Sequence, residues 1–161
     1  MTMVPVPNPY DCLFEVRPEW LDPNGHMNVA FSLRAVDDGS NPFFDDIGLG
    51  WGYTAAGEGS IFVTGCNLDF HRELFAGDPI RVTTRLIDWS PKLLHCWAEV
   101  YHARDGWLAS TAETLYMHIS LRTRRSAAMP EAAQTRLAEI LPVHASLPQP
   151  AALGRALRIR R

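Results

Sequence analysis

The sequence has few cysteines and no long apolar run. Its 3 cysteines, at positions 12, 66 and 96, are widely spaced and form no Cys-x-x-Cys pair, which argues against a disulfide framework and against a zinc site. No apolar run is long enough to span a bilayer, and the proline-rich start lacks the basic and apolar parts of a secretory signal. We therefore expect reduced core cysteines, no metal, no membrane association and a cytoplasmic protein.

An excess of positive charge is also missing. The formal net charge of -3 argues against a general binder of nucleic acid or of membrane surfaces. Of the 15 basic residues only Lys92 is a lysine, a bias that, together with the many alanines, indicates a GC-rich bacterial genome. There is no phosphate-binding loop, dinucleotide-binding glycine pattern or Gly-x-Ser-x-Gly elbow, so nucleotide-driven and serine-hydrolase chemistry are disfavoured.

Apolar alternation predicts most of the chain to be strands. A length of 161 residues fits one domain, which we expect over 1–141, followed by a tail over 142–161. Strands separated by turn residues are predicted over 10–16, 60–71, 80–89, 93–103 and 107–123. In the second of these, the alternation puts Phe62, Cys66, Leu68 and Phe70 on one face.

Two segments have helical character. The first follows Asn28, a good N-cap, and carries an apolar stripe of Val29, Ala30, Leu33 and Val36. The segment 39–42 should kink or divide this helix, 49–59 should form a loop, and a further helix is expected over 129–141.

One long helix ahead of consecutive antiparallel strands is best buried when the sheet wraps around it. The predicted fold class is therefore α+β. The other sheet face shows Trp97 and Tyr101 and needs cover from the tail or from a partner, so we expect an oligomer.

The loop Asp22-Pro23-Asn24-Gly25-His26-Met27-Asn28 joins the first strand to this helix. Turn chemistry explains its first four residues, with Asp22 as the acceptor of an Asx turn. The alternative is catalytic: a carboxylate beside a helix N-terminus can act as nucleophile or base next to backbone N–H donors for a developing oxyanion. The amides of residues 27–29 are the candidate donors, while His26 either holds the loop or takes part in the chemistry.

Other polar residues allow two interpretations each. Asn67, Asp69, His71 and Glu73 form either an exposed sheet edge or part of a site. Glu113 is either a structural carboxylate or an assistant from across a dimer interface. The cluster of Arg122, Arg124 and Arg125 is either a solvated strand end or a phosphate contact.

The loop resembles the Asp-x-x-Gly-His-x-Asn motif of hotdog-fold acyl-CoA thioesterases of the 4-hydroxybenzoyl-CoA thioesterase type, and 70–78 resembles their segment between the second and third strands. The whole chain, tail included, also resembles thioesterases of carnitine and betaine catabolism, whose substrate would be betainyl-CoA. The resemblance implies a five-stranded antiparallel sheet around a central helix, dimers with a joined sheet, and sites at the dimer interface. It also implies that Asp22 is the nucleophile or base and that the amide of Val29 polarises the thioester carbonyl.

The resulting hypothesis is an acyl-CoA thioester hydrolase that needs no metal and no organic cofactor. Asp22 and His26 are the catalytic candidates, and Asn28, Val29 and Arg124 are the substrate-binding candidates. The expected assembly is a homodimer or a tetramer of dimers. The alternatives are a non-catalytic acyl-CoA-binding protein and a hydratase or dehydratase on the same fold.

Overall fold

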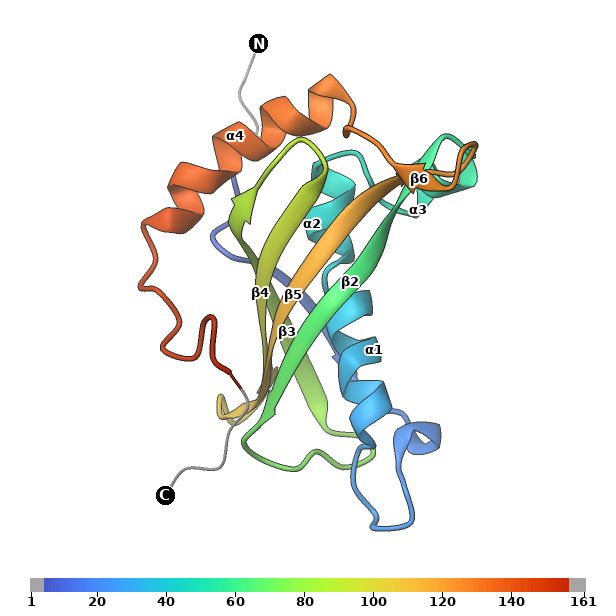
Figure 1. Cartoon of the computed structure of the whole chain (residues 1–161). Helices are drawn as coiled ribbons and strands as arrows, with labels where there is room; N and C mark the ends of the chain where they lie inside the picture. Colours follow the sequence, from blue (N-terminus) through green and yellow to red (C-terminus); the bar gives the residue numbers. More distant parts are fainter. Residues whose placement is uncertain (1–4, 157–161) are drawn as a thin grey trace.

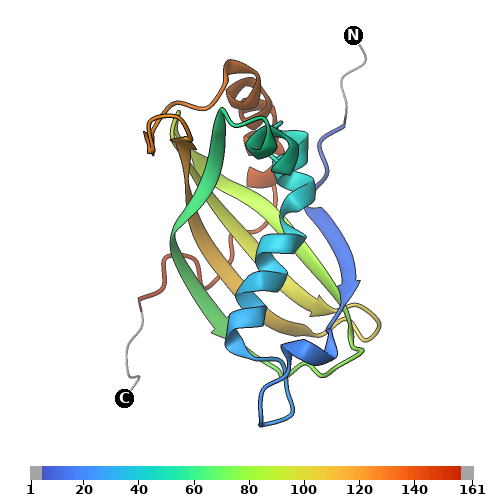
Figure 2. The same ribbon diagram turned by 90° about the vertical axis from the view of Figure 1, so that its right-hand side faces the viewer.

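A strongly curled antiparallel sheet holds the central helix against its concave face (Figures 1 and 2). The structure is a computed structural model that describes residues 5–156. The sheet order is β1-β3-β4-β5-β2, and the short strand β6 pairs with β5. The strands are β1 (Tyr10–Glu15), β2 (Gly59–Phe70), β3 (Pro79–Trp89), β4 (Leu93–His102), β5 (Leu108–Ser120) and β6 (Arg125–Ser126). This arrangement confirms the predicted α+β hotdog fold.

The central helix is divided where the sequence predicted. Helix α1 (Val29–Gly39) is followed directly by α2 (Asn41–Asp46). A Cβ atom added at Gly39 would lie 2.4 Å from Cβ of Val82, so the helix crosses the sheet where only glycine fits. The segment expected to be a loop contains a further short helix, α3 (Trp51–Ala55). A 3-10 turn, η1 (Pro18–Trp20), precedes the Asp22 loop.

The predicted apolar stripe of α1 is correct at Val36 and wrong at Val29 and Ala30, which are exposed. The helix buries Ser32, Ala35, Val36 and Gly39 against the sheet, whereas Val29 is 57% exposed. Close contact between helix and sheet favours small residues, which an apolar count does not detect. Val29 therefore begins α1 with its side chain exposed rather than buried.

Strand β2 contains an irregularity between Val63 and Gly65 that reverses part of the predicted alternation. Cys66 pairs with Thr114, but Phe62 pairs with Met117, which lies on the opposite face of β5. The extra residue of a bulge shifts every side chain on one side of it to the other face. Phe62 is therefore on the convex face, while Cys66 and Leu68 point toward the helix.

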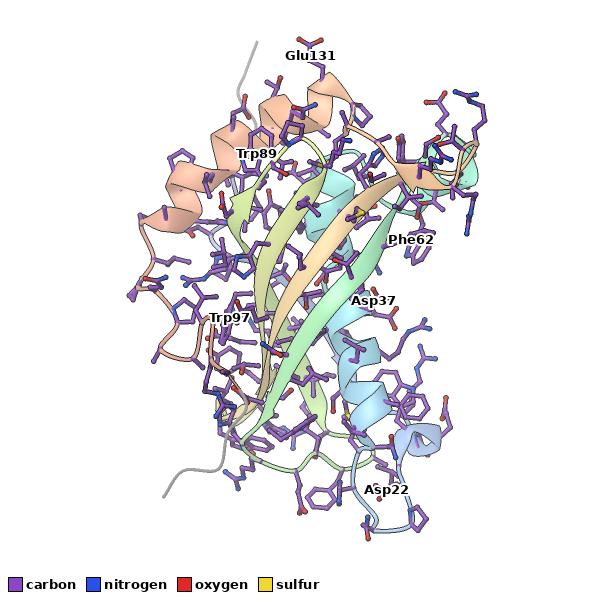
Figure 3. All side chains as sticks on the ribbon, in the orientation of Figure 1. Asp22, Asp37, Phe62, Trp89, Trp97 and Glu131 are labelled. Atoms are coloured by element: carbon purple, nitrogen blue, oxygen red, sulfur yellow. The ribbon has the colours of Figure 1, made fainter. Side chains whose placement is uncertain are left out.

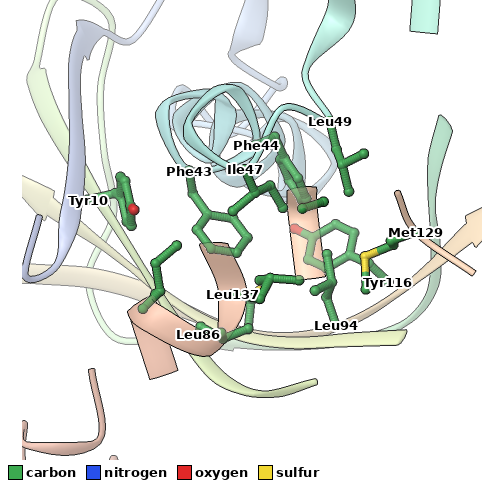
Figure 4. Packing of buried hydrophobic residues seen from close by; sticks show 13 residues of the cluster. Tyr10, Phe43, Phe44, Ile47, Leu49, Leu86, Leu94, Tyr116, Met129 and Leu137 are labelled. Atoms are coloured by element: carbon green, nitrogen blue, oxygen red, sulfur yellow. The ribbon is translucent and has the colours of Figure 1, made fainter. Parts of the chain in front are cut away.

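One apolar cluster lies between α2, the sheet and the C-terminal helix α4 (Glu131–Ala145), as Figure 4 shows. Helix α4 runs past its predicted end and contains Pro142. Ile140 and His144, on either side of this proline, are both buried, so packing holds the helix together across it. His144 is 2% exposed: its Nδ1 accepts the N–H of Leu86 at 2.8 Å, and its Nε2 donates to the carbonyl of Pro7 at 2.9 Å. No helix within residues 5–156 is both long and apolar enough to cross a membrane.

The segment after α4 crosses the convex face of the sheet. Trp97 is only 5% exposed, and Leu147, Pro148 and Pro150 border the same hollow. Farther along, the amide of Gly154 donates to Glu113 at 2.7 Å. The tail therefore supplies cover that the large residues of this face need.

Candidate active site

The Asp22 loop forms a small hairpin at one end of the molecule (Figure 3). The amide of Asp22 donates to the carbonyl of His26 at 3.0 Å, and that of Gly25 donates to the carbonyl of Asp22 at 2.9 Å. The φ of Gly25 is 84°, a conformation that favours glycine. Oδ1 of Asp22 accepts the amide of Asn24 at 2.8 Å, so the Asx turn is present. The turn engages one carboxylate oxygen.

The hydrogen bonds at the start of α1 single out one amide. The amide of Met27 donates to the carbonyl of Leu74 at 2.8 Å, and the amide of Asn28 donates to the carbonyl of Trp20 at 2.9 Å. The amide of Ala30 donates to Oδ1 of Asn28 at 2.9 Å, which confirms Asn28 as the N-cap. Within residues 5–156 the N–H of Val29 has no such acceptor. Two of the three candidate oxyanion donors are thus occupied, and Val29 is left.

A pocket of about 310 Å³ lies at this helix start, walled by His26, Val29, Phe70, Glu73 and Ser110, among others. Nδ1 of His26 lies 3.2 Å from the carbonyl oxygen of Met27, and its Nε2 lies 3.9 Å from Oε1 of Glu73. The pocket thus brings together His26, Val29 and Glu73. Asp22 lies in the adjoining loop and does not line it.

Arg124 lies far from this pocket within one protomer. It occupies the turn between β5 and β6, with a φ of 57°, and its guanidinium lies 5.4 Å from the centre of the Phe62 ring. Figure 3 shows Phe62 and Asp22 toward opposite ends of the molecule. Arg124 therefore does not contact the Asp22 loop in this chain.

Glu113 belongs to a separate region on the convex face. Its Oε1 lies 2.8 Å from Nε2 of His95, and its Oε2 accepts the Gly154 amide. His95 and the Gly154 amide thus occupy both oxygens of the Glu113 carboxylate. Glu113 also borders a different cavity, of about 480 Å³, together with Trp89 and Asn67. These contacts favour the structural interpretation of Glu113.

Comparison with known proteins gives consistent matches. The sequence model of the family described as Thioesterase-like superfamily matches residues 16–137. The betainyl-CoA thioesterase of Pseudomonas aeruginosa is 31% identical over 142 residues, which cover 88% of this chain and 89% of that protein. A Ruegeria pomeroyi protein named L-carnitine dehydrogenase/betainyl-CoA thioesterase is 33% identical over 140 residues, 87% of this chain but 28% of that longer protein.

Solved structures agree with these matches. A Staphylococcus aureus protein determined in complex with CoA superposes with a TM-score of 0.86 at 28% identity, covering 99% of this chain and 100% of the other. The DHNA-CoA thioesterase of Staphylococcus aureus, at 14% identity, shares the fold with a TM-score of 0.78 over 85% of this chain and 93% of its own.

Proposed function

We propose a substrate and a mechanism for this chain, which belongs to the Thioesterase-like superfamily and is an acyl-CoA thioester hydrolase. The substrate is a short acyl-CoA, with betainyl-CoA as the first candidate because the Pseudomonas aeruginosa relative of that name matches most of both chains. The products are a carboxylate and free CoA. The unpaired cysteines support a reducing, cytoplasmic setting.

The observation that carries the mechanism is the unoccupied N–H of Val29 at the start of α1. A thioester carbonyl placed there meets a fixed donor and the positive end of a helix, both of which stabilise the oxyanion of the tetrahedral intermediate. Asp22 either takes a proton from a water that attacks the carbonyl carbon, or attacks that carbon itself; in both cases the C–S bond breaks and the CoA thiolate leaves. In the second case an acyl–Asp22 anhydride forms, and water hydrolyses it to the carboxylate and free Asp22. Asn28 holds the helix start, and His26 holds the pocket wall beside Glu73.

We also propose that the enzyme is a dimer formed through β2. This strand ends the sheet and has a free edge over its 12 residues. Exposed apolar side chains line that edge: Val63 is 47% and Phe70 55% exposed. A second copy pairing antiparallel about the middle of β2 would cover both and join the two sheets. It would also carry Arg124 of the partner subunit, near Phe62, toward the catalytic end, where it can meet a CoA phosphate.

The test is release of free thiol from a panel of acyl-CoAs. The key variant is Asp22→Asn, because an asparagine oxygen can still accept the Asn24 amide and keep the turn. Loss of the carboxylate should lower kcat by about 10²–10⁴-fold. Glu19→Gln, an exposed position in η1, is the matched control and should leave the rate unchanged.

Binding of acyl-CoA without thiol release by the wild type would favour the non-catalytic alternative, and hydration of an unsaturated acyl-CoA with the thioester intact would favour the hydratase. An unchanged rate in Asp22→Asn would overturn the role of Asp22.

A further inference from the structure

A further and smaller pocket lies between α1, α3 and the first half of β2. Its volume is about 50 Å³, and its wall includes Asp37, Phe44, Trp51, Ile61, Val63 and Tyr116. The wall thus combines one carboxylate, from α1, with three aromatic rings. Figure 3 shows Asp37 on α1, well away from the Asp22 loop.

The Asp37 side chain is partly buried, and the charge of Arg34 acts on its carboxylate without contacting it. Within residues 5–156 it makes no hydrogen bond or ion pair, whereas the adjacent Asp38 binds Nε of Arg34 at 2.7 Å. Burial, reinforced by the charge of Asp38, raises the pKa of Asp37. A partly desolvated carboxylate without a partner gains stability when a cation binds beside it.

The aromatic rings favour one kind of cation. Trp51 is 63% exposed, so its ring is free to contact a ligand, whereas Phe44 and Tyr116 are buried in the core and meet edge to face with their centroids 5.1 Å apart. A quaternary ammonium group has no N–H to donate and is recognised by aromatic faces together with a negative charge. Carboxylate and rings together therefore match a methylated ammonium better than a hydrogen-bonding amine.

The two pockets of one protomer are too far apart to hold one short acyl group. Val29 and Asp37 are eight residues apart on α1, about 12 Å along the helix axis. In a betainyl thioester a single methylene separates the carbonyl carbon from the ammonium nitrogen. The Asp37 of the same protomer therefore cannot reach the ammonium of a thioester bound at Val29.

Twofold pairing of β2 resolves this separation. Phe70 lines the pocket at Val29, and Ile61 lines the pocket at Asp37, at opposite ends of the same strand. An antiparallel partner places Ile61 of the partner subunit beside the end that carries Phe70. The Val29 pocket of one protomer then faces the Asp37 pocket of its partner.

We propose that Asp37 and Trp51 of the partner subunit form the cation-binding end of the acyl pocket and select acyl groups that carry a quaternary ammonium. This inference rests on the proposed thioesterase mechanism and dimer. It assigns substrate selection to residues outside the catalytic loop.

The test compares betainyl-CoA with 3,3-dimethylbutanoyl-CoA, in which carbon replaces the ammonium nitrogen at nearly the same shape. The wild type should favour betainyl-CoA in kcat/KM by about tenfold or more. Asp37→Asn should remove most of that preference, with the rate on the neutral analogue unchanged. Glu131→Gln removes an equal charge at an exposed position at the start of α4 and should alter neither rate. Trp51→Ala, at an exposed position, should reduce the preference without affecting folding.

Mixed dimers test the sharing of the site. Asp22→Asn and Asp37→Asn protomers, unfolded together and refolded, should regain roughly one quarter of the wild-type betainyl-CoA activity, because half of the dimers carry one intact site. If each site lay within one protomer, the mixture would show only the average of the two variants.

Equal wild-type rates on the two substrates would overturn the cation site and leave the thioesterase standing. So would an equal loss on both substrates in Asp37→Asn. Failure of the wild type to hydrolyse any acyl-CoA would instead overturn the function on which this inference rests.

Discussion

Replacement of Val29 by proline should remove the proposed oxyanion donor and leave the fold intact. Proline lacks an N–H, and at the first position of a helix that group has no partner in the turn. In this structure the N–H of Val29 makes no hydrogen bond among residues 5–156, so none is lost. The preceding residue must be extended, and Asn28 already has φ -65° and ψ 147°.

The expected magnitude follows from the loss of a single donor. Removing one oxyanion donor costs about 3–4 kcal/mol of transition-state stabilisation, or 10²–10³-fold in kcat. The free energy of unfolding should change by about 1 kcal/mol or less, because proline at such a site is compatible with the backbone. Val29→Ala retains the N–H and is the matched control.

The assay is kcat from thiol release, read beside urea unfolding of the same samples. Proline should lower kcat at nearly unchanged stability, and alanine should have little effect on kcat. If Val29→Pro folds normally and turns over like the wild type, the oxyanion assignment is wrong.

Three further predictions concern packing, pH and assembly. Gly39→Ala should lose about 1–3 kcal/mol in urea unfolding, since the added methyl would lie 2.4 Å from Cβ of Val82. This loss should be smaller in a Val82→Ala background, which removes the two γ carbons that also crowd the methyl; full additivity of the two changes would contradict this contact. Burial lowers the pKa of His144, whose neutral Nδ1 accepts the Leu86 amide, so stability should be complete above about pH 6.5 and fall below it by up to about 1.4 kcal/mol per pH unit. Urea unfolding of His144→Asn should lack this acid-dependent loss, and an identical pH profile in both proteins would refute it. Val63→Lys, near the middle of β2, should place two lysines close together across the proposed dimer axis and yield monomers in sedimentation.

Much of the fold could be predicted from the sequence because its signals are local. Period-two alternation and turn residues located the five long strands, and Asn28 was identified as a cap from its residue type alone. The sheet face that Phe62 occupies could not be predicted, because the register shift after Val63 arises in the pairing of β2 with β5 and not from the residues of β2 alone. Likewise, α1 buries Ser32 and exposes Val29, since close contact with the sheet decides which face is inside.

The candidate site divides in the same way. The motif located Asp22, His26 and Val29 in one loop and helix start; in the structure His26 and Val29 line one pocket, and Asp22 lies in the adjoining hairpin. The residue types and their spacing left the amides of Met27, Asn28 and Val29 as equal candidates, and only the family resemblance indicated Val29. The acceptors of the other two amides come from Leu74, distant in the chain, and from Trp20 in the preceding turn, which local sequence does not reveal. Asp37 had no signal in the sequence, since its importance depends on a carboxylate that no cation contacts among residues 5–156 and on rings from three other elements.

Exposure of the oxyanion site links catalysis to assembly. Val29 is 57% exposed in one protomer, and a backbone donor surrounded by water stabilises an oxyanion much less than one in a site that excludes water. The proposed partner covers this end of β2 and so should strengthen the donor without touching it. Monomeric Val63→Lys should therefore lose activity on the neutral analogue 3,3-dimethylbutanoyl-CoA as well as on betainyl-CoA. A specific activity that rises with protein concentration, in parallel with dimer formation in sedimentation, is the expected result. A fully active monomer would contradict both the shared pocket and the need for the partner to exclude water.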